Sequence, residues 1–345
     1  MSWNSAMHAL CLESPKTFRL IELPEPALPG SGEALVRVHR VGICGTDISA
    51  FLGKMPFVTY PRILGHELGV EVLAIGDGVT NVKAGERCSV EPYMNDPDSY
   101  ASRRGRSNCC EKLQVLGVHT DGGMRPQFLI RADKLHASRQ LSFEQLALVE
   151  TLAIGRHAVV RSELAGYETC LVIGAGPIGL ATLEFVRLID ARFAVADLSQ
   201  PRLDFCRRQM QVEHVLKPTS QFENQLREVF GGNLPDVVID ATGNPGSMSA
   251  AFGLIAHGGR LVFVGLTGEE IHFRHSAFHR PEGTLLCSRN ALPADFTHII
   301  SLIESGRIDT RPWITHRCPL ADLPHQMPAY LDPTAGVVKA VVSLD

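Results

Sequence analysis

The stretch that most constrains the fold is LVIGAGPIG, where three glycines follow an apolar, strand-like run. Gly174, Gly176 and Gly179 have the spacing G-x-G-x-x-G and lie between the strand-like TCLVIGAG and the helical pattern PIGLATLEFVRLI. Glycines at this spacing permit a tight turn and let backbone amides approach a pyrophosphate at the start of a helix. The next strand-like run, RFAVAD, ends on Asp197, eighteen residues after Gly179. The pattern predicts a dinucleotide-binding βαβ unit, although such glycines alone can also serve close strand–helix packing.

Asp197 bears on which dinucleotide binds. A carboxylate at the end of the second strand accepts hydrogen bonds from both ribose hydroxyls and repels a 2′-phosphate, which favours NAD over NADP. The alternative is that Asp197 is a solvated strand end or a helix cap. Two later strand ends, DATG and VGL, are placed to flank the nicotinamide. The residues predicted to bind the cofactor in this part of the chain are Gly174, Gly176, Pro177, Ile178, Gly179, Asp197, Thr242, Val264, Gly265 and Leu266.

The order of apolar runs along the chain predicts the fold class. After Phe143, strand-like and helical patterns alternate from TCLVIGAG to GGRLVFVGL, which is typical of βαβ units and a doubly wound parallel sheet. The first third has short apolar runs separated by Gly and Pro, which is typical of a β-rich domain with long loops. A chain of 345 residues is also long enough for two cores. The sequence therefore predicts an α/β protein with two domains.

Composition and charge exclude several classes of partner. The formal net charge is −4 with no block of like charges, so we expect no nucleic-acid or membrane binding, and a small molecule as the partner. The longest apolar runs are too short or too polar for a bilayer span, and the N-terminus has no secretion signal, which leaves the cytoplasm as the expected location. The nine cysteines are then expected to be reduced thiols, apart from any that serve a metal or catalysis.

Four residues form a candidate metal site. Cys44 lies in VGICGTD, His66 and Glu67 lie in RILGHELG, and Glu150 lies in LALVETLAIG. Thiolate, imidazole and carboxylate together suit zinc, and a catalytic site keeps one position open for water or substrate. Taken singly, the first three could be a core thiol, a hydrogen-bonded core histidine and a loop charge. Glu150 lies in an apolar stretch, where a metal or a hydrogen-bonded substrate would offset the cost of burying its charge.

The adjacency of His66 and Glu67 leaves the ligand set open. In a regular strand their side chains would point to opposite faces, and Gly65 is expected to mark a turn or bulge that relaxes this constraint. Either both residues reach the metal, or Glu67 supports the ligands from behind while Glu150 binds the metal directly or through water.

Seven motifs together resemble the zinc-dependent medium-chain dehydrogenase/reductase superfamily: GICGTD, GHE, AGERCSVEP, GVHTDGG, VETLAIG, VIGAGPIGL and GGRLVFVGL. The resemblance runs from about residue 7 to the end and is strongest to the branch of sorbitol, other polyol, sugar-acid and threonine dehydrogenases. It implies a GroES-like β-rich catalytic domain (1–153), a Rossmann NAD-binding domain (154–292) and a return to the catalytic domain (293–345). It also implies a homodimer or a homotetramer.

The resemblance gives roles to individual positions. Cys44 and His66 match zinc ligands of the family. Glu67 matches the carboxylate of the GHE motif, and Glu150 matches the glutamate that completes the site in this branch. Thr46, two residues after the cysteine, matches the hydroxyl that relays the substrate proton.

Three further positions matter for the proton and the cofactor. Many relatives have a histidine where this chain has Ser49, so the route by which the proton leaves is open. His119 could substitute for that histidine, although an ordinary loop histidine is the simpler interpretation. Lys339 falls where a basic residue often meets the cofactor phosphates, and Arg289 falls near the cofactor and substrate cleft; a surface lysine and an ion-paired arginine are the alternatives.

The segment SVEPYMNDPDSYASRRGRSNCC departs from the family. Relatives often have four cysteines there that bind a structural zinc, whereas the matching positions hold Asp96, Ser99, Ser102 and Cys110. Serine is rarely deprotonated, and aspartate is a harder ligand than thiolate. We therefore expect one catalytic zinc per chain and no structural zinc.

The predicted function is NAD-dependent oxidation of a secondary alcohol, which is a polyol, a sugar or a sugar acid. An L-threonine dehydrogenase or another alcohol dehydrogenase would use the same chemistry. A zinc-free quinone or enone reductase would share the fold but would not need the candidate metal ligands. From a different class, the chain could be a catalytically silent NAD-binding regulatory relative, against which the presence of every candidate ligand argues.

Overall fold

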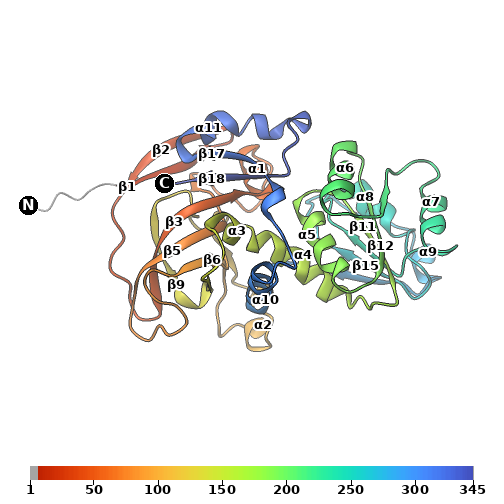
Figure 1. Ribbon diagram of the computed structural model, residues 1–345, viewed down its shortest axis with the longest axis horizontal. Helices are drawn as coiled ribbons and strands as arrows, with labels where there is room; N and C mark the ends of the chain where they lie inside the picture. Colours follow the sequence, from red (N-terminus) through yellow and green to blue (C-terminus); the bar gives the residue numbers. More distant parts are fainter. Residues whose placement is uncertain (1–6, 345) are drawn as a thin grey trace, which may run out of the picture. The chain divides into compact units, whose positions relative to one another are not determined.

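The computed structural model describes residues 7–344, and the chain divides into two compact units. Unit 1 comprises the chain up to Glu150 together with the segment from Leu292 onward, and unit 2 is Thr151–Ala291. In unit 1, Figure 1 shows the blue C-terminal strands β17 (Ile314–Pro319) and β18 (Lys339–Ser343) beside the red and orange strands of the N-terminal part. The end of the chain is therefore part of the same domain as its beginning.

Unit 1 is built mainly on a seven-stranded sheet. Its strand order is β10-β6-β5-β3-β18-β17, and β9 pairs with the first half of β3. The C-terminal β18 pairs antiparallel with the second half of β3 and parallel with β17. The other strands of this sheet are β3 (Glu33–Ile43), β5 (Glu67–Ile75), β6 (Arg87–Val90), β9 (Gln127–Arg131) and β10 (Leu135–Ser138).

Smaller elements complete unit 1. A three-stranded sheet has the order β2-β1-β4, and β7 pairs with β8. These strands are β1 (Met7–Ser14), β2 (Thr17–Leu23), β4 (Arg62–Ile63), β7 (Tyr93–Met94) and β8 (Gln114–Val115). The helices are α1 (Gly45–Phe51), α2 (Tyr100–Arg103), α3 (Phe143–Ala147), α10 (Pro293–Glu304) and α11 (Leu323–Gln326). Short 3-10 helices are η1 (Ser107–Cys109), η2 (Ala132–Lys134), η3 (Arg311–Trp313), η4 (Leu320–Asp322), η5 (Ala329–Leu331) and η6 (Pro333–Ala335).

The core of unit 1 follows from the alternation of its strands. In β3, Ala34, Val36 and Val38 are buried while Arg37 between the two valines is exposed, as expected for a strand with one face on a core. β18 has the buried run Lys339–Val342, so it lies deep in the sheet in spite of its place near the end of the chain. The buried lysine in this run is the one feature that apolar packing does not explain.

Unit 2 is a six-stranded parallel sheet with the order β13-β12-β11-β14-β15-β16. This order is that of a dinucleotide-binding sheet, and such sheets bind ligands at the carboxyl ends of the strands, where the strand order reverses beside β11. The strands are β11 (Thr169–Ile173), β12 (Arg192–Ala196), β13 (His214–Leu216), β14 (Val237–Asp240), β15 (Arg260–Phe263) and β16 (Thr284–Cys287). The helices are α5 (Pro177–Arg187), α6 (Gln200–Gln209), α7 (Phe222–Val229), α8 (Pro245–Ala251) and α9 (His275–His279). Helix α4 (Val149–Ser162) begins in unit 1 and continues into unit 2.

Two features of the described residues bear on the sequence-based expectations. The nine cysteines all lie within residues 7–344 and are free thiols, six of them buried. No helix in the described part of the chain is both long enough and apolar enough to span a bilayer. The cytoplasmic location stays a prediction.

Candidate metal and cofactor sites

The first part of the candidate metal site is the N-terminus of α1. Cys44 is the N-cap residue of this helix, and Thr46 and Asp47 lie in its first turn. The Asp47 carboxylate accepts hydrogen bonds from the backbone N–H of Cys44 at 2.9 Å and from that of Gly65 at 3.3 Å. Asp47 is fully buried, so it ties the cysteine segment to the histidine segment inside the core of unit 1.

Gly65 produces the local turn that the adjacency of His66 and Glu67 requires. Its φ of 96° is in the left-handed region that favours glycine, and a Cβ at this position would lie 2.8 Å from Val41 Cγ1. β5 begins only at Glu67, so His66 precedes the regular strand and is not bound to its alternation. The Gly65 carbonyl accepts a hydrogen bond from the N–H of Gly123 at 2.8 Å, which fixes the turn against the GVHTDGG loop.

This turn brings three potential ligands together. One donor atom each from Cys44, His66 and Glu67 lie within 4.8 Å of one another. A tetrahedral zinc ion with bonds of about 2.0–2.3 Å needs donors about 3.5 Å apart, so small side-chain movements would close the group on a metal. Nδ1 of His66 is buried without a hydrogen-bond partner and faces Asp47 Oδ1 at 3.8 Å. The donor types and the spacing fit zinc, with Asp47 behind the imidazole.

The charges around His66 also suit a cation. Burial on its own would lower the pKa of His66, but the negative charges of Asp47 and Cys44 outweigh it and hold the pKa well above its usual value. A zinc ion would take the place of the proton, because metal ligands bind in their deprotonated form. The site therefore offers excess negative charge for one positive ion.

Glu67 is buried, paired with Lys339 and accommodated by a glycine. It is fully buried, and the Nζ of Lys339 donates to its Oε1. Gly42 lies opposite Glu67 in the β3–β5 register, and a Cβ at Gly42 would lie 2.1 Å from Glu67 Oε2. Glycine at this position therefore makes room for the carboxylate.

The structure gives Lys339 a partner that sequence reasoning did not predict. Its side chain is 1% exposed and its ammonium pairs with Glu67 in unit 1, and the expected contact with cofactor phosphates stays a prediction. Burial alone would lower the pKa of Lys339; the Glu67 carboxylate more than offsets this and raises the pKa. A buried ammonium needs a buried counter-charge, which Glu67 supplies.

Glu150 lies in the first turn of α4 and is 4% exposed. Its Oε1 accepts a hydrogen bond from the hydroxyl of Tyr93 in β7. Burial raises the pKa of Glu150, and the nearby charge of His66 partly opposes that rise. Glu150 is therefore beside the ligands, but it is not a member of the three-residue group within 4.8 Å.

Three hydroxyl or imidazole groups were candidates for proton transfer. Thr46 and Ser49 are both half-buried on α1, three residues apart and therefore one turn from each other. His119 accepts a hydrogen bond at Nδ1 from the backbone N–H of Val115 at 3.1 Å, and its ring stacks on Phe57 at 6.2 Å between centroids. Thr46 lies two residues after Cys44, in the first turn of α1, and Ser49 lies one turn further along the same helix.

The glycine fingerprint in unit 2 divides into packing and binding positions. Gly174 has a φ of 97°, and a Cβ at Gly179 would lie 1.7 Å from the Gly174 carbonyl oxygen, so both glycines are needed for the turn itself. Gly176 is the N-cap residue of α5, and a Cβ there would meet only Arg202 Nη1, at 3.7 Å. Gly176 therefore leaves open space at a helix N-terminus, where backbone N–H groups favour an anion.

The other predicted cofactor residues lie at the carboxyl ends of the strands. The Asp197 carboxylate accepts hydrogen bonds from the N–H of Ala175 at 2.6 Å and of Ser199 at 2.7 Å, so it joins the fingerprint to the end of β12. Thr242 follows β14, and a Cβ at Gly265 would lie 2.1 Å from the nitrogen of Gly243. Val264 follows β15, and its backbone N–H donates to the Asp240 carbonyl. Leu266 is exposed, and Arg289 follows β16.

The segment in which the family resemblance implies a structural zinc is held together here by hydrogen bonds. Cys110 is buried, and its Sγ accepts from the N–H of Asp96 at 3.3 Å. Ser99 and Ser102 share a hydrogen bond of 2.9 Å, and Ser99 caps α2. Burial alone would raise the pKa of Cys110, but hydrogen bonds led by that of Ser99 lower it. These four side chains bond to one another and to the local backbone.

Comparison with known proteins identifies the family. Residues 30–140 match the alcohol dehydrogenase GroES-like domain, and residues 177–305 match the zinc-binding dehydrogenase domain. The L-galactonate-5-dehydrogenase of Escherichia coli K12 is 40% identical over 321 residues, which cover 92% of this chain and 94% of the relative. The chain belongs to the zinc-binding alcohol dehydrogenase family. Human sorbitol dehydrogenase is 31% identical over 329 residues, covering 90% of this chain and 89% of the relative.

Solved structures agree with this family. An alcohol dehydrogenase from Escherichia coli CFT073, complexed with NADH, superposes with a TM-score of 0.91 at 26% identity and covers 99% of this chain and 100% of that one. The expectations of a GroES-like domain, a Rossmann domain and a dehydrogenase are confirmed. The chain is therefore grouped with the oxidoreductases.

Some residues of the dehydrogenase site were missed by sequence reasoning. Asp47 lies in the GICGTD motif, and an acidic residue three positions after a helix cap is a recognisable signal of a helix start. Tyr93 has no such signal, because its partner Glu150 is 57 residues away in the chain. Contacts at that separation depend on the fold.

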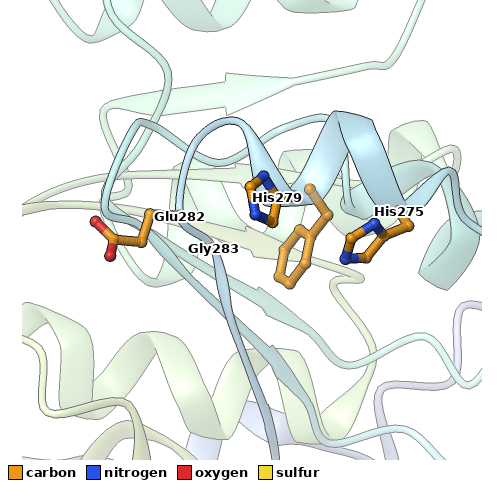
Figure 2. A pocket seen from close by; sticks show the side chains of 5 residues that line it. His275, His279, Glu282 and Gly283 are labelled. Atoms are coloured by element: carbon orange, nitrogen blue, oxygen red, sulfur yellow. The ribbon is translucent and has the colours of Figure 1, made fainter.

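A hollow of about 360 Å³ lies elsewhere in unit 2. Figure 2 shows it beside α9, with His275 and His279 on that helix and Glu282 pointing away from them. The two imidazole centroids are 5.3 Å apart. None of the residues that line the hollow is among the predicted site residues, so it is not assigned to the reaction.

Proposed function

We propose that this dehydrogenase oxidises a secondary hydroxyl of a sugar acid of the galactonate type, with NAD as the hydride acceptor. The observation that carries the proposal is the buried group of Cys44, His66 and Glu67, whose thiolate, imidazole and carboxylate suit a catalytic zinc. Similarity to L-galactonate-5-dehydrogenase over nine-tenths of the chain supports the substrate class. A neutral polyol is the second candidate, supported by the weaker similarity to sorbitol dehydrogenase.

Cys44, His66 and Glu67 would hold the zinc ion, and Asp47 would fix the imidazole of His66 from behind. Zinc at such a site acts as a Lewis acid that makes an alcohol proton easier to remove. Thr46, two residues from Cys44 in the first turn of α1, would accept the proton from the substrate hydroxyl while giving its own hydroxyl proton to Ser49, one turn further along the helix. Ser49 would in turn release a proton to solvent.

The cofactor is held by the loops of unit 2. Backbone amides of the fingerprint at the N-terminus of α5 bind the pyrophosphate, and Gly176 leaves the room for it. Asp197 accepts hydrogen bonds from the adenosine ribose, and its charge disfavours a 2′-phosphate, so NAD is the cofactor. Thr242, Val264, Gly265 and Leu266 line the nicotinamide half, and Arg289 lies near it. Bound NAD supplies the hydride acceptor, and the protein supplies its orientation.

We also propose that the chain holds one zinc and that residues 1–153 and 293–345 form the catalytic domain around residues 154–292. Only one thiol, that of Cys110, lies among the four positions Asp96, Ser99, Ser102 and Cys110. Hydrogen bonds already link these side chains to one another and to the local backbone. Serine hydroxyls are poor zinc ligands at neutral pH. The segment is therefore stabilised without a metal.

A homodimer through β16 is the proposed assembly. In the described chain β16 pairs only with β15, so one edge of the parallel sheet presents backbone groups that no strand covers. Leu285 on this strand is 41% exposed, and Thr284 and Cys287 are also exposed. An apolar, uncharged edge is a template for pairing with another strand, and a second copy offers the same edge.

The substrate proposal is tested by measuring NAD reduction with a panel of aldonates, polyols and L-threonine. We expect an aldonate of the galactonate type to have the highest kcat/KM, and Cys44→Ser to lose turnover of every substrate. A highest kcat/KM for a neutral polyol would select the second candidate, and one for L-threonine would contradict both.

A further inference from the structure

Two buried glutamates at the metal site are each held by a different donor. The Lys339 ammonium donates to Oε1 of Glu67, and the Tyr93 hydroxyl donates to Oε1 of Glu150. Glu67 belongs to the group within 4.8 Å of Cys44 and His66, and Glu150 does not. Glu67 is therefore part of the candidate ligand group, and Glu150 lies outside it.

The hydroxyl of Tyr93 is itself firmly placed. Tyr93 is 2% exposed, and its backbone pairs with Val115 in the β7–β8 ladder. Its ring contacts the ring of Phe296 on α10 edge-on, with centroids 6.3 Å apart. Phe296 is fully buried, and its ring also stacks on His136 at 4.9 Å between centroids. A tyrosine ring packed in this way offers its hydroxyl in one direction.

The position of Glu150 explains why its orientation matters. The charges of His66 and Lys339 lower the pKa of Glu150 and that of Glu67 raises it, so the carboxylate is within electrostatic range of the candidate ligands. A buried carboxylate that loses its hydrogen bond gains by turning toward a positive charge, and in the loaded enzyme the metal would supply one. Glu150 would then occupy the position that a substrate oxygen needs.

We propose that Tyr93 is a positioning residue for the dehydrogenase: its hydroxyl holds Glu150 and keeps that carboxylate from competing with the substrate at the Cys44–His66–Glu67 site. The proposal rests on the proposed function of that site. A hydrogen bond to a charged group is strong enough to shift an equilibrium about tenfold or more. Loss of the hydroxyl should therefore change substrate binding much more than the maximal rate.

The test is Tyr93→Phe, which removes the hydroxyl and keeps the ring. We expect the KM for the alcohol to rise about tenfold, while kcat and the KM for NAD change less than twofold. Cobalt-substituted protein should show an altered visible absorption spectrum without substrate, because Glu150 joins the ligands. The matched control is Tyr330→Phe, which removes another buried tyrosine hydroxyl of unit 1, bonded to Cys318 Sγ at 3.4 Å; its kinetics and spectrum should equal those of the wild type.

A double-mutant comparison separates positioning from packing. If Tyr93 acts through Glu150, then Tyr93→Phe has no further effect on the KM of a Glu150→Gln protein. The proposal is overturned if Tyr93→Phe leaves both the KM and the cobalt spectrum unchanged. It is also overturned if Tyr330→Phe has the same effect, or if the effect of Tyr93→Phe persists in the Glu150→Gln background.

A second variant covers the case in which Tyr93→Phe does not fold. Phe296→Leu leaves every polar group in place and loosens the ring contacts with Tyr93 and His136. We expect the KM for the alcohol to rise about threefold with the KM for NAD unchanged; an unchanged KM for the alcohol would contradict the proposal. Zinc analysis of the same preparations distinguishes the two levels of failure. A wild type without zinc refutes the proposed function, whereas a zinc-loaded, active wild type beside an unaltered Tyr93→Phe refutes the positioning role alone.

Discussion

Substitution of Lys339 by methionine isolates the electrostatics of the metal site. Both Lys339 and Glu67 are at most 1% exposed, and the ammonium donates to the carboxylate. Methionine keeps most of the side-chain volume and removes the charge, so Glu67 stays buried without its counter-charge. Removal of one partner of a buried ion pair costs about 3–5 kcal/mol of unfolding free energy. We expect a loss of this size in metal-free protein.

Zinc should reverse most of that loss. A divalent ion beside Glu67 replaces the missing positive charge, so the difference between variant and wild type should fall to about 2 kcal/mol or less, the size of the remaining hydrogen-bond loss. The assay is urea unfolding with a chelator and again with zinc, followed by circular dichroism and by tryptophan fluorescence, to which Trp313, buried in unit 1, contributes. Comparison of variant with wild type under each condition removes the general stabilisation by a bound ligand.

The chain contains a matched control for this experiment. Lys134 is 2% exposed and donates to Oε1 of the buried Glu91, whose Oε2 also lies 3.4 Å from His136 Nε2, and this cluster is outside the candidate ligand group. Lys134→Met should also lose stability without metal, and zinc should not restore it. The reasoning is refuted if zinc leaves the loss in Lys339→Met unchanged, or if it restores both variants equally.

Three further predictions address the cofactor, the ion pair that joins the C-terminal strand β17 to α3, and the assembly. Asp197→Asn removes the charge from the ribose position, so the ratio of kcat/KM for NAD to that for NADP should fall at least about tenfold, the strength of one charge-assisted hydrogen bond; an unchanged ratio would show that Asp197 does not select the cofactor. The hydrogen bond from Arg317 lowers the pKa of Glu144 below 4.5, so the ion pair stabilises the folded state above that pH and stops doing so as the pH falls through the lowered pKa. Arg317→Met should therefore lose at most about 1 kcal/mol at neutral pH and nothing at low pH in urea unfolding, and a loss that persists at low pH would contradict the assignment. Leu285→Lys places a charge on the exposed edge of β16 and should convert dimers to monomers in sedimentation, whereas unchanged dimers would place the interface elsewhere.

Much of the fold could be predicted because its signals are local. The parallel sheet of unit 2 follows from alternating strand and helix patterns, and the roles of Gly174 and Gly179 follow from their spacing around one turn. The return of the C-terminal segment to unit 1 was expected only through family resemblance. The strand-like run GVVKAVVSL does not itself indicate β3 as a partner, because pairing across some 300 residues leaves no periodic trace.

Part of the candidate site could likewise be predicted from local signals, and part could not. Cys44, His66 and Glu67 could be proposed because thiolate, imidazole and carboxylate are unusual together in glycine-rich motifs. The pairing of Lys339 with Glu67 could not be predicted, since it joins residues 272 positions apart and the lysine alone looks like a surface or phosphate-binding residue. Tyr93 was missed because a tyrosine in a loop-like segment has many fates, and only the fold shows that its hydroxyl meets Glu150.

The most direct test of the account is metal analysis of the protein purified without added zinc, beside Cys44→Ser and Cys110→Ser. Cys44 belongs to the proposed catalytic site, and Cys110 is the one thiol at the positions that bind structural zinc in relatives. We predict one zinc per chain in the wild type and in Cys110→Ser, and none in Cys44→Ser. Zinc retained by Cys44→Ser, or lost from Cys110→Ser, would contradict the assignment of the metal site.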